Sequence, residues 1–447
     1  MKKKLYFFLT SISLLCLTFS LILNGLFSKF ATSYVKHNIE YLSSDEFKGR
    51  LCGSEENLRV VNEISNLFKK YNLKPLDKDY KENFNALIPI KNNKTPSLEI
   101  MNNSCLIKNF CLGKDFKDDF LNFKTSSIEF TNKDRIDIYS NGFSIFKDGI
   151  EYLFCINSNN SFSFRSSFFA NSHYGFVIQI TTFTFNEILN SLRSGYTLKV
   201  QMPYEIKEKE LNNVVGKING FSSKLPPLIL TAHFDHIGSD SLNTIYNGAL
   251  DNASGISFLL ELARTFSSLK FPQRDIIFVA LNGEEMGLLG SNAFASKYKE
   301  KLHGATVINF DMIGVDNIPI TFIGGKDTQS NSSTLLNNLE RLCDLKNINY
   351  LESYANSSDH ASFIKNDFDS ITISHADTTN IHTPNDTAEK ISASAINNVY
   401  DLVQDEIKEF AYNNIFLFFY NSKTILFFTI SSFLLVGFKF IKIKKLK

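Results

Sequence analysis

The sequence has no Cys-x-x-Cys pair and, away from its two ends, no excess of positive charge. Because no two cysteines have the close spacing of a thiolate metal site, the six cysteines do not suggest metal binding. The two ends carry eight lysines, and the rest of the chain has 39 basic residues against 46 acidic ones. A mildly acidic chain lacks the basic surface that binds nucleic acid, so nucleic acid is not an expected partner.

Charge is also absent from two long runs near the ends of the chain, residues 5–28 and 424–438. A helix needs about 20 apolar residues to cross a bilayer, and lysines that flank a shorter run extend its usable length. We therefore expect an N-terminal signal anchor or signal peptide at residues 5–28 and a C-terminal transmembrane segment at residues 415–441.

Both runs have an alternative interpretation. The length of the first favours an uncleaved anchor, whereas the small residues from Ala31 to Ser33 leave a cleaved signal peptide open. The second could instead be an amphipathic or core helix. Since lysines flank both runs on the terminal side, the positive-inside rule places both termini in the cytoplasm. The expected location is the cell membrane, with the lipid bilayer as a partner and the middle of the chain on the extracytoplasmic side, periplasmic or extracellular.

Three kinds of pattern divide the chain between these runs. Residues 34–83 have apolar residues at helical spacing around a polar loop, and residues 84–210 contain short alternating strands with turns rich in Asn and Ser. Residues 211–413 alternate between strands and helices. We predict an α/β fold with a mostly parallel central sheet flanked by helices, an inserted mainly β domain at residues 84–210 and a transmembrane segment at each end.

Histidines and acidic residues follow the strands predicted in residues 211–413. Ligands bind at the carboxyl ends of strands in open α/β sheets, so these side chains are expected to meet at one edge. They are His233 and Asp235 after the run 228–231, Asp251 before a helix, Glu284 and Glu285 after the run 275–281, Asp311 after the run 305–310, and His382 in a loop that contains Pro384.

Imidazole and carboxylate ligands without thiolate suit zinc, or less often manganese or cobalt. Two ions about 3.5–4 Å apart are best held by a carboxylate that gives one oxygen to each, and Asp251 stands where this bridge is expected. His233 with Asp311 would serve one ion, and Glu285 with His382 the other. We therefore expect two zinc ions per chain as cofactors.

Further residues have expected roles beside these ligands. Glu284 is not expected to share the metal of Glu285, because neighbouring side chains diverge. A free carboxylate beside an activated water can take its proton, so Glu284 is the candidate general base. Asp235 lies two residues from His233 and can orient its ring. His236 is interpreted as a structural or supporting residue.

Five segments of this region resemble the co-catalytic two-zinc aminopeptidase family, which includes bacterial leucyl aminopeptidases and glutamate carboxypeptidase II. The polar loop at residues 43–54 and the stretch 357–363 are also similar, so the resemblance extends over residues 34–412. The five segments are His233-Phe-Asp-His-Ile-Gly, Gly248-Ala-Leu-Asp-Asn-Ala-Ser-Gly, Asn282-Gly-Glu-Glu-Met-Gly-Leu-Leu-Gly-Ser, Asn309-Phe-Asp-Met-Ile-Gly and His382-Thr-Pro-Asn-Asp, in the order of the family.

The resemblance implies a zinc exopeptidase-like fold for a catalytic domain at residues 211–413, with residues 34–83 as its first part. Residues 84–210 resemble the protease-associated insert of some members, and Asp359 and His360 match a segment near the pocket. The remaining implied roles are zinc binding by His233, Asp251, Glu285, Asp311 and His382, with Asp251 as the bridge, general base catalysis by Glu284, and support of His233 by Asp235.

The expected function is that of a membrane-anchored zinc-dependent exopeptidase. Most directly it would be an aminopeptidase that removes N-terminal residues from peptide substrates by means of a metal-activated water. The alternatives are a non-catalytic receptor or scaffold on the same fold and a glutaminyl-cyclase-like aminoacyl transferase. The sequence leaves open amino- versus carboxypeptidase action, the preferred side chain and the oligomeric state.

Overall fold

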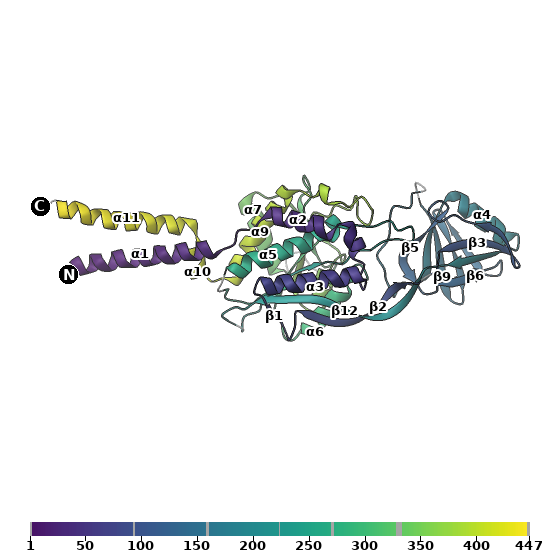
Figure 1. The fold of residues 1–447 in the computed structure, drawn as a ribbon, viewed down its shortest axis with the longest axis horizontal. Coiled ribbons are helices and arrows are strands. Elements are labelled where there is room, and N and C mark those ends of the chain that lie inside the picture. Colours follow the sequence, from purple (N-terminus) through teal and green to yellow (C-terminus); the bar gives the residue numbers. More distant parts are fainter. Residues whose placement is uncertain are drawn as a thin grey trace.

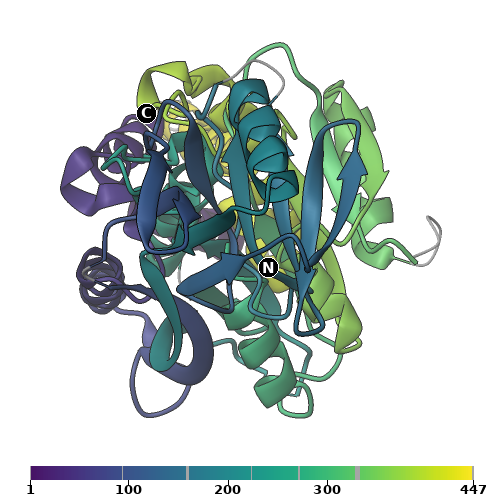
Figure 2. The ribbon, with the colours of Figure 1, turned by 90° about the vertical axis from the view of Figure 1, so that its right-hand side faces the viewer.

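The computed structural model has three parts in a row, which are two long terminal helices, a central α/β part and a mainly β part (Figure 1). Both ends of the chain lie at the end of the molecule opposite the β part. In Figure 2 the β part faces the viewer. The structure describes residues 2–92, 94–157, 161–222, 224–269, 272–327 and 333–444.

A nine-stranded sheet forms the centre of the α/β part, in the order β1-β12-β14-β13-β15-β18-β16-β17, with β2 paired to β12. These strands are β1 (Lys74–Pro75), β2 (Lys81–Lys91), β12 (Tyr204–Ile218), β13 (Leu228–His233), β14 (Ile276–Leu281), β15 (Thr306–Phe310), β16 (Ile320–Gly324), β17 (Tyr350–Tyr354) and β18 (Asp369–Ser374).

The sheet is mixed, so the prediction of a mostly parallel sheet is correct for its middle and wrong for its edges. The four strands β14, β13, β15 and β18 are parallel to one another. In contrast, β12 pairs antiparallel with β14, and β16 pairs antiparallel with β18. β12 needs no crossover helix of the kind that parallel strands require, because it enters the sheet directly from its long pairing with β2.

Helices cover both faces of this sheet. One face packs against the first five helices named below, and the other face packs against α6 and α8. Continuous apolar strands such as β13 and β14 are typical of a sheet that is buried on both sides. The helices are α2 (Thr32–Leu42), α3 (Glu55–Lys70), α5 (Gly255–Ser268), α7 (Thr334–Lys346), α9 (Ala393–Ala411), α6 (Leu289–Tyr298) and α8 (His360–Lys365).

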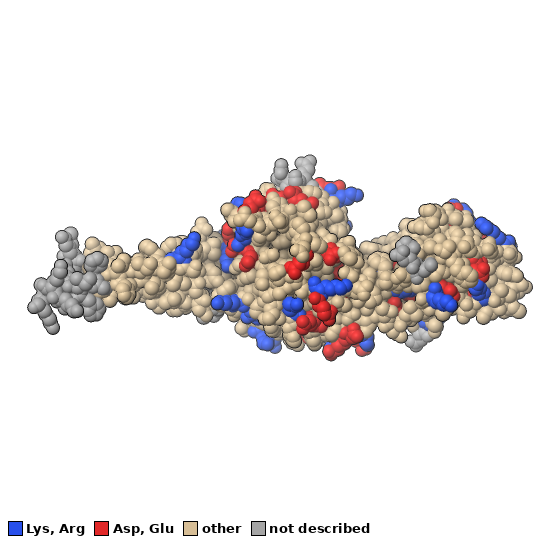
Figure 3. Space-filling view, turned by 90° about the horizontal axis from the view of Figure 1, so that it is seen from above, with Lys and Arg blue, Asp and Glu red and all other residues tan. Residues whose placement is uncertain are grey.

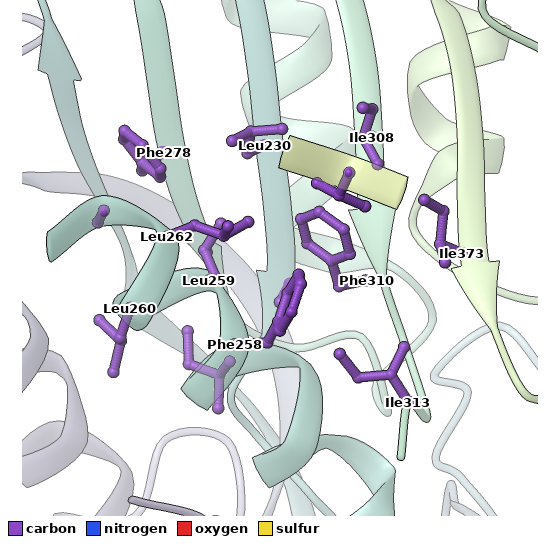
Figure 4. Packing of buried hydrophobic residues seen from close by; sticks show 14 of the residues in the cluster. Leu230, Phe258, Leu259, Leu260, Leu262, Phe278, Ile308, Phe310, Ile313 and Ile373 are labelled. Atoms are coloured by element: carbon purple, nitrogen blue, oxygen red, sulfur yellow. The ribbon is translucent and has the colours of Figure 1, made fainter. Parts of the chain in front are cut away.

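The contact between α5 and the sheet shows how this core is filled (Figure 4). Phe258 of α5 meets Phe310 of β15 at a ring-centroid distance of 5.0 Å, edge to face. Leu230 and Phe278 extend from the sheet toward the same helix and are fully buried. The core therefore packs directly behind the carboxyl ends of the strands, and it makes that edge rigid.

The mainly β part consists of two smaller sheets with a phenylalanine-rich core of their own. We call residues 97–201 the β unit. One sheet has the order β5 (Phe116–Phe123), β10 (Tyr174–Ile180), β9 (Ile150–Ile156), β8 (Gly142–Lys147) and β7 (Arg135–Tyr139), the other has the order β4 (Cys105–Asn109), β3 (Ser97–Asn102), β11 (Thr197–Gln201) and β6 (Ser127–Phe130), and α4 (Thr182–Arg193) lies between β10 and β11 in the sequence.

A long two-stranded ribbon joins the β unit to the central sheet. β2 and β12 pair antiparallel without a break from Tyr204 opposite Lys91 to Val214 opposite Lys81. Residues 84–91 and 204–210 therefore belong to this ribbon rather than to the two small sheets.

The terminal helices are α1 (Lys2–Leu26), α10 (Asn414–Tyr420) and α11 (Ser422–Lys444). Within the described residues, α1 is long and apolar enough to cross a membrane, and α10 with α11 qualifies as a second span if this pair, bent by 65°, is counted as one. α1 and α11 lie side by side, with the hydroxyls of Ser13 and Ser432 2.8 Å apart. The part of their surface that is not grey in Figure 3 is almost uncharged, whereas charged residues are scattered over the other two parts. Lys445 and Lys447, which entered the prediction of orientation, lie outside the described residues.

Candidate active site

The predicted site residues lie at the carboxyl edge of the parallel strands. His233 is the last residue of β13, and Asp311 directly follows β15. Glu284 and Glu285 lie in the turn after β14, and Asp251 lies in an irregular turn just before α5. His382 reaches the same edge from the loop after β18.

His233, Asp251 and Asp311 form the first ligand group. The Nε2 atom of His233 is 3.4 Å from Oδ1 of Asp311 and 3.5 Å from Oδ1 of Asp251. All three side chains are buried. Their atoms lie close enough together to hold one metal ion.

Asp251, Glu285, His382 and His236 form the second ligand group. The Nε2 atom of His382 is 3.2 Å from Oδ2 of Asp251 and 3.1 Å from Oε1 of Glu285. His236 also reaches this group, since its Nδ1 atom is 3.0 Å from Oε1 of Glu285 and 3.8 Å from Oδ2 of Asp251. Sequence reasoning gave His236 only a structural or supporting role, whereas the structure places its ring among the candidate ligands.

The two oxygens of Asp251 face different groups, as a carboxylate bridge between two ions requires. A tetrahedral zinc ion with bonds of 2.0–2.2 Å separates its ligand atoms by about 3.3 Å, and the spacings within both groups are close to this value. Among the residues that the structure describes, several buried atoms that converge here have no hydrogen-bond partner, for example Nε2 of His233, Oδ1 of Asp311 and Oε1 of Glu285. Buried polar atoms are normally satisfied, so these residues fit two bound cations.

The electrostatics of the site also call for positive charge. Burial by itself would lower the pKa of His382, but Glu285 and Asp251 raise this pKa to about 11. Burial likewise opposes ionisation of His233, yet Asp311 and its neighbours hold the pKa of His233 well above its usual range. The buried carboxylates thus retain nearby cations strongly, which is the property a metal centre needs.

The adjacent residues Glu284 and Glu285 have opposite environments. Burial raises the pKa of Glu284 well above its usual range, and the neighbouring charge of Glu285 adds to this effect. Burial also disfavours the charged form of Glu285, but His382 and His236 outweigh it and lower the pKa of Glu285 well below its usual range. Two neighbouring carboxyl groups with pKa values pushed apart are suited to different roles, one as a proton acceptor and one as a ligand.

Asp235 holds the turn that carries both glutamates. Its Oδ1 atom accepts hydrogen bonds from the backbone N–H groups of Gly283 (2.8 Å) and Glu284 (3.2 Å), and its Oδ2 atom accepts one from Glu285 (3.2 Å). The Nδ1 atom of His233 is 3.3 Å from the backbone oxygen of Asp235 and 3.8 Å from its Oδ1 atom. Asp235 therefore positions the catalytic turn as well as lying beside the His233 ring.

Three more residues support the site without having been singled out from the sequence. Asp386 accepts hydrogen bonds from the backbone N–H groups of Leu250 (2.8 Å) and Asp251 (3.0 Å). Ser358 donates its hydroxyl to Oδ2 of Asp311 at 2.7 Å. Both belong to segments that carried the family resemblance, which was the available signal. The third is Arg50, a fully buried guanidinium that donates to the carbonyls of Leu42, Phe234, Asn247 and Gly248.

The β unit also reaches the site, through residues 164–169. The hydroxyl of Ser167 donates to Oε2 of Glu285, and the ring of Phe164 stacks on His382 with a centroid distance of 5.8 Å. No spacing pattern in the sequence links these residues to ligands more than a hundred positions away. Beside the site lies a hollow of about 540 Å³, partly lined by Gly287 and Leu288.

Two groups of histidines and carboxylates around a shared aspartate, at the edge of an α/β sheet, are the kind of ligand set that two-metal hydrolytic enzymes use. Residues 213–407, which include all the predicted ligands, match Peptidase family M28. This matched region, which is a little under half of the chain, is therefore similar to the M28 peptidase family. The resemblance drawn from the sequence motifs is thereby confirmed at the level of the family.

Similar proteins carry names that agree with this family. A vacuolar membrane protease of Clavispora lusitaniae is 42% identical over 85 residues, which are 19% of this chain and 8% of that protein. Aminopeptidase YwaD of Bacillus subtilis is 29% identical over 209 residues, which are 44% of each chain. The chain thus spans less than half the length of these curated relatives.

Solved structures share the fold. An aminopeptidase from Aneurinibacillus sp. strain AM-1 superimposes with a TM-score of 0.58 at 21% identity, covering 86% of this chain and 95% of that one. A zinc aminopeptidase from Bacillus subtilis also gives a TM-score of 0.58, at 17% identity, covering 86% and 96%. These similarities agree with a mixed α/β fold of the aminopeptidase kind.

Proposed function

We propose that the protein is a membrane-anchored zinc exopeptidase, and specifically an aminopeptidase that uses two zinc ions. The observation that carries this proposal is the position of Asp251, whose two oxygens lie within 3.5 Å of His233 on one side and of His382 on the other. The match of residues 213–407 to a peptidase family and the names of the relatives support it.

The chain's own residues divide the work of hydrolysis. Zinc bound at such a site would polarise the peptide carbonyl as a Lewis acid. It would also lower the pKa of water, so that hydroxide is available to attack this carbonyl. Glu284 takes the proton of the attacking water and passes it to the leaving amine when the C–N bond breaks, so that its carboxylate is regenerated. Asp235 holds the turn of Glu284 through three backbone N–H groups and keeps the base in place.

Two acidic residues that are not candidate ligands, Glu284 and Asp359, favour the N-terminus of a peptide over its C-terminus. Both lie close enough to His233 to interact with its charge. In their ionised form such carboxylates attract a free α-ammonium group and repel a C-terminal carboxylate. The names of the aminopeptidase relatives agree with this preference.

Anchoring in a lipid bilayer is the second element of the proposal. It rests on α1, which carries no charge from Leu5 onward, and on the bent pair of α10 and α11, which is long and apolar enough to cross a bilayer if it is counted as one unit. The relative from Clavispora lusitaniae is named a vacuolar membrane protease, which supports membrane anchoring. The lysines outside both runs favour cytoplasmic termini, with the catalytic part on the extracytoplasmic side.

The full chain purified in detergent allows a direct test. We expect two zinc ions per chain and hydrolysis of peptides with a free N-terminus, but no hydrolysis of the same peptides with an acetylated N-terminus. Cleavage that instead requires a free C-terminus would reject the aminopeptidase assignment. Zinc without turnover would favour a receptor or scaffold, and cyclisation of N-terminal glutamine would favour a glutaminyl-cyclase-like transferase.

A further inference from the structure

Residues 164–169 of the β unit, here called the strap, lie against the second ligand group. The strap makes two backbone hydrogen bonds to its ligands. The N–H of Phe168 donates to the carbonyl of Glu285 at 2.8 Å, and the N–H of Arg165 donates to the carbonyl of His382 at 3.1 Å. The strap thus fixes the main chain of two candidate ligands that come from different loops of the catalytic part.

Ser167 adds a contact to a ligand side chain. Its hydroxyl donates to Oε2 of Glu285 at 2.5 Å, a short bond of the kind that a carboxylate forms with a hydroxyl. The other oxygen of Glu285, Oε1, is the one that faces His382 and His236. The serine therefore occupies one oxygen of the carboxylate and leaves the other directed at the position of the second ion.

The first ligand group is held from elsewhere. Ser358 bonds Asp311, which belongs to the first group alone, and Asp386 bonds the backbone N–H of Asp251, which both groups share. Ser358 and Asp386 both belong to the catalytic part. Within the described part of the chain, the strap's hydrogen bonds to candidate ligands go to Glu285 and His382 of the second group. The two groups therefore differ in which part of the molecule supports them.

The strap is itself fastened to the β unit and to the first residue of β12 in the ribbon. The guanidinium of Arg165 is buried 4.0 Å from the centre of the Phe120 ring, and its Nη2 atom donates to the hydroxyl of Tyr204 at 3.0 Å. The N–H of Phe169 donates to the carbonyl of Leu121 at 2.9 Å. The position of the strap consequently follows the position of the β unit.

We propose that Ser167 is a positioning residue for the second metal ion, and that the β unit through its strap sets the affinity of that ion but not of the first. The proposal rests on the proposed two-zinc function. Residues that hold a metal ligand by a hydrogen bond typically change metal affinity about 10- to 100-fold when they are removed. The β unit is thus part of the metal centre, although its strands contribute no ligand of their own.

Zinc titration of the full chain against a chromogenic chelator measures the two binding steps separately. Ser167→Ala is expected to weaken one step about 10- to 100-fold and to leave the other unchanged. Ser167→Thr, which keeps the hydroxyl, should restore affinity toward the wild-type value. Ser163→Ala is the matched control, because this exposed serine lies next to the strap and its hydroxyl, within the described residues, accepts a hydrogen bond from Ser161 and contacts no candidate ligand.

A mirror experiment assigns the steps to the groups. Ser358→Ala removes the support of Asp311 and should weaken the step that Ser167→Ala leaves unchanged. In a His382→Ala background, which lacks a ligand of the second group, adding Ser167→Ala should not change the affinity of the remaining ion. Circular dichroism shows that each variant is folded.

Suppose that the wild-type protein binds two zinc ions. If Ser167→Ala then weakens both binding steps equally, or weakens neither, this proposal alone is overturned. Fewer than two ions in the wild-type protein would overturn the proposed two-zinc function together with it. The two failures are therefore distinguishable in one titration series.

Discussion

Replacing each of the adjacent glutamates by glutamine should separate catalysis from metal binding. Glutamine has nearly the same shape but cannot take up a proton or carry charge. Glu285 lies 3.0–3.1 Å from ring nitrogens of His236 and His382, which places it in the second ligand group. Glu284 lies in the same turn, and its raised pKa reflects burial rather than a bound partner. We expect Glu284→Gln to keep both zinc ions and Glu285→Gln to lose one.

The magnitudes follow from the role of each group. A positioned general base typically contributes about 10²- to 10⁴-fold to the rate, so Glu284→Gln should lower kcat by that factor, or about 3–5 kcal/mol in activation free energy. For Glu285→Gln the loss of the negative ligand should lower the affinity of the second ion by at least about 100-fold, because even a residue that only supports a ligand changes affinity by about 10- to 100-fold.

Metal content by mass spectrometry and kcat at saturating zinc test the pair together. Glu284→Gln with near-wild-type kcat would refute the assignment of the base. Glu285→Gln with two tightly bound ions would refute its place in the second group. If both variants lost metal and activity to the same degree, the distinction drawn from their opposite environments would fail.

Three further predictions concern the bridge, a buried cation and a buried histidine. Asp251→Ala should lose both zinc ions, because each ligand group loses one oxygen, and a zinc titration measures this. Arg50→Met leaves three buried carbonyl acceptors and the partly buried one of Asn247 without their donor, which should cost at least about 3 kcal/mol of unfolding free energy in urea denaturation, and wild-type stability would contradict this. Burial lowers the pKa of His375 from 6.5 to about 4, so the unfolded chain takes up the proton first. Stability is therefore full above about pH 6.5 and falls toward pH 4 by at most about 1.4 kcal/mol per pH unit, and His375→Gln should flatten this slope in denaturation curves taken from pH 7 to 4.5.

Much of the fold could be predicted because the catalytic part is built from local patterns. The two apolar runs at residues 228–231 and 305–310 are strands, as predicted. His233 lies at the end of the first strand, and Asp311 directly follows the second. The parallel order of these strands then brings their ends to one edge. Local periodicity and the topology rules for α/β sheets together identify His233, Glu285, Asp311 and His382, which the structure groups around Asp251, but not His236.

The remaining features depend on contacts that local pattern does not encode. β12 is antiparallel because it arrives from the ribbon with β2, and nothing in its own residues specifies that direction. Ser167 meets Glu285 across 118 positions of sequence, so no spacing rule connects them. His236 was given only a structural or supporting role, but the chain leaves the strand after His233 and turns the later ring back toward Glu285.

The ribbon of β2 and β12 makes the spacing between the two halves of the molecule a matter of strand register. Each residue of a strand advances the chain by about 3.3 Å, and its side chains alternate between the two faces. Deleting one residue from β2 alone would shift the register, so that every following residue pairs with a different residue of β12. The side chains of these residues would then point to the opposite face of the ribbon. A different β unit grafted onto this enzyme would therefore have to be joined at a paired position of the ribbon, such as Tyr204 and Lys91. A junction that is one residue out of register would displace the strap by about 3.3 Å, which is as large as the distance between two ligand atoms of one zinc ion.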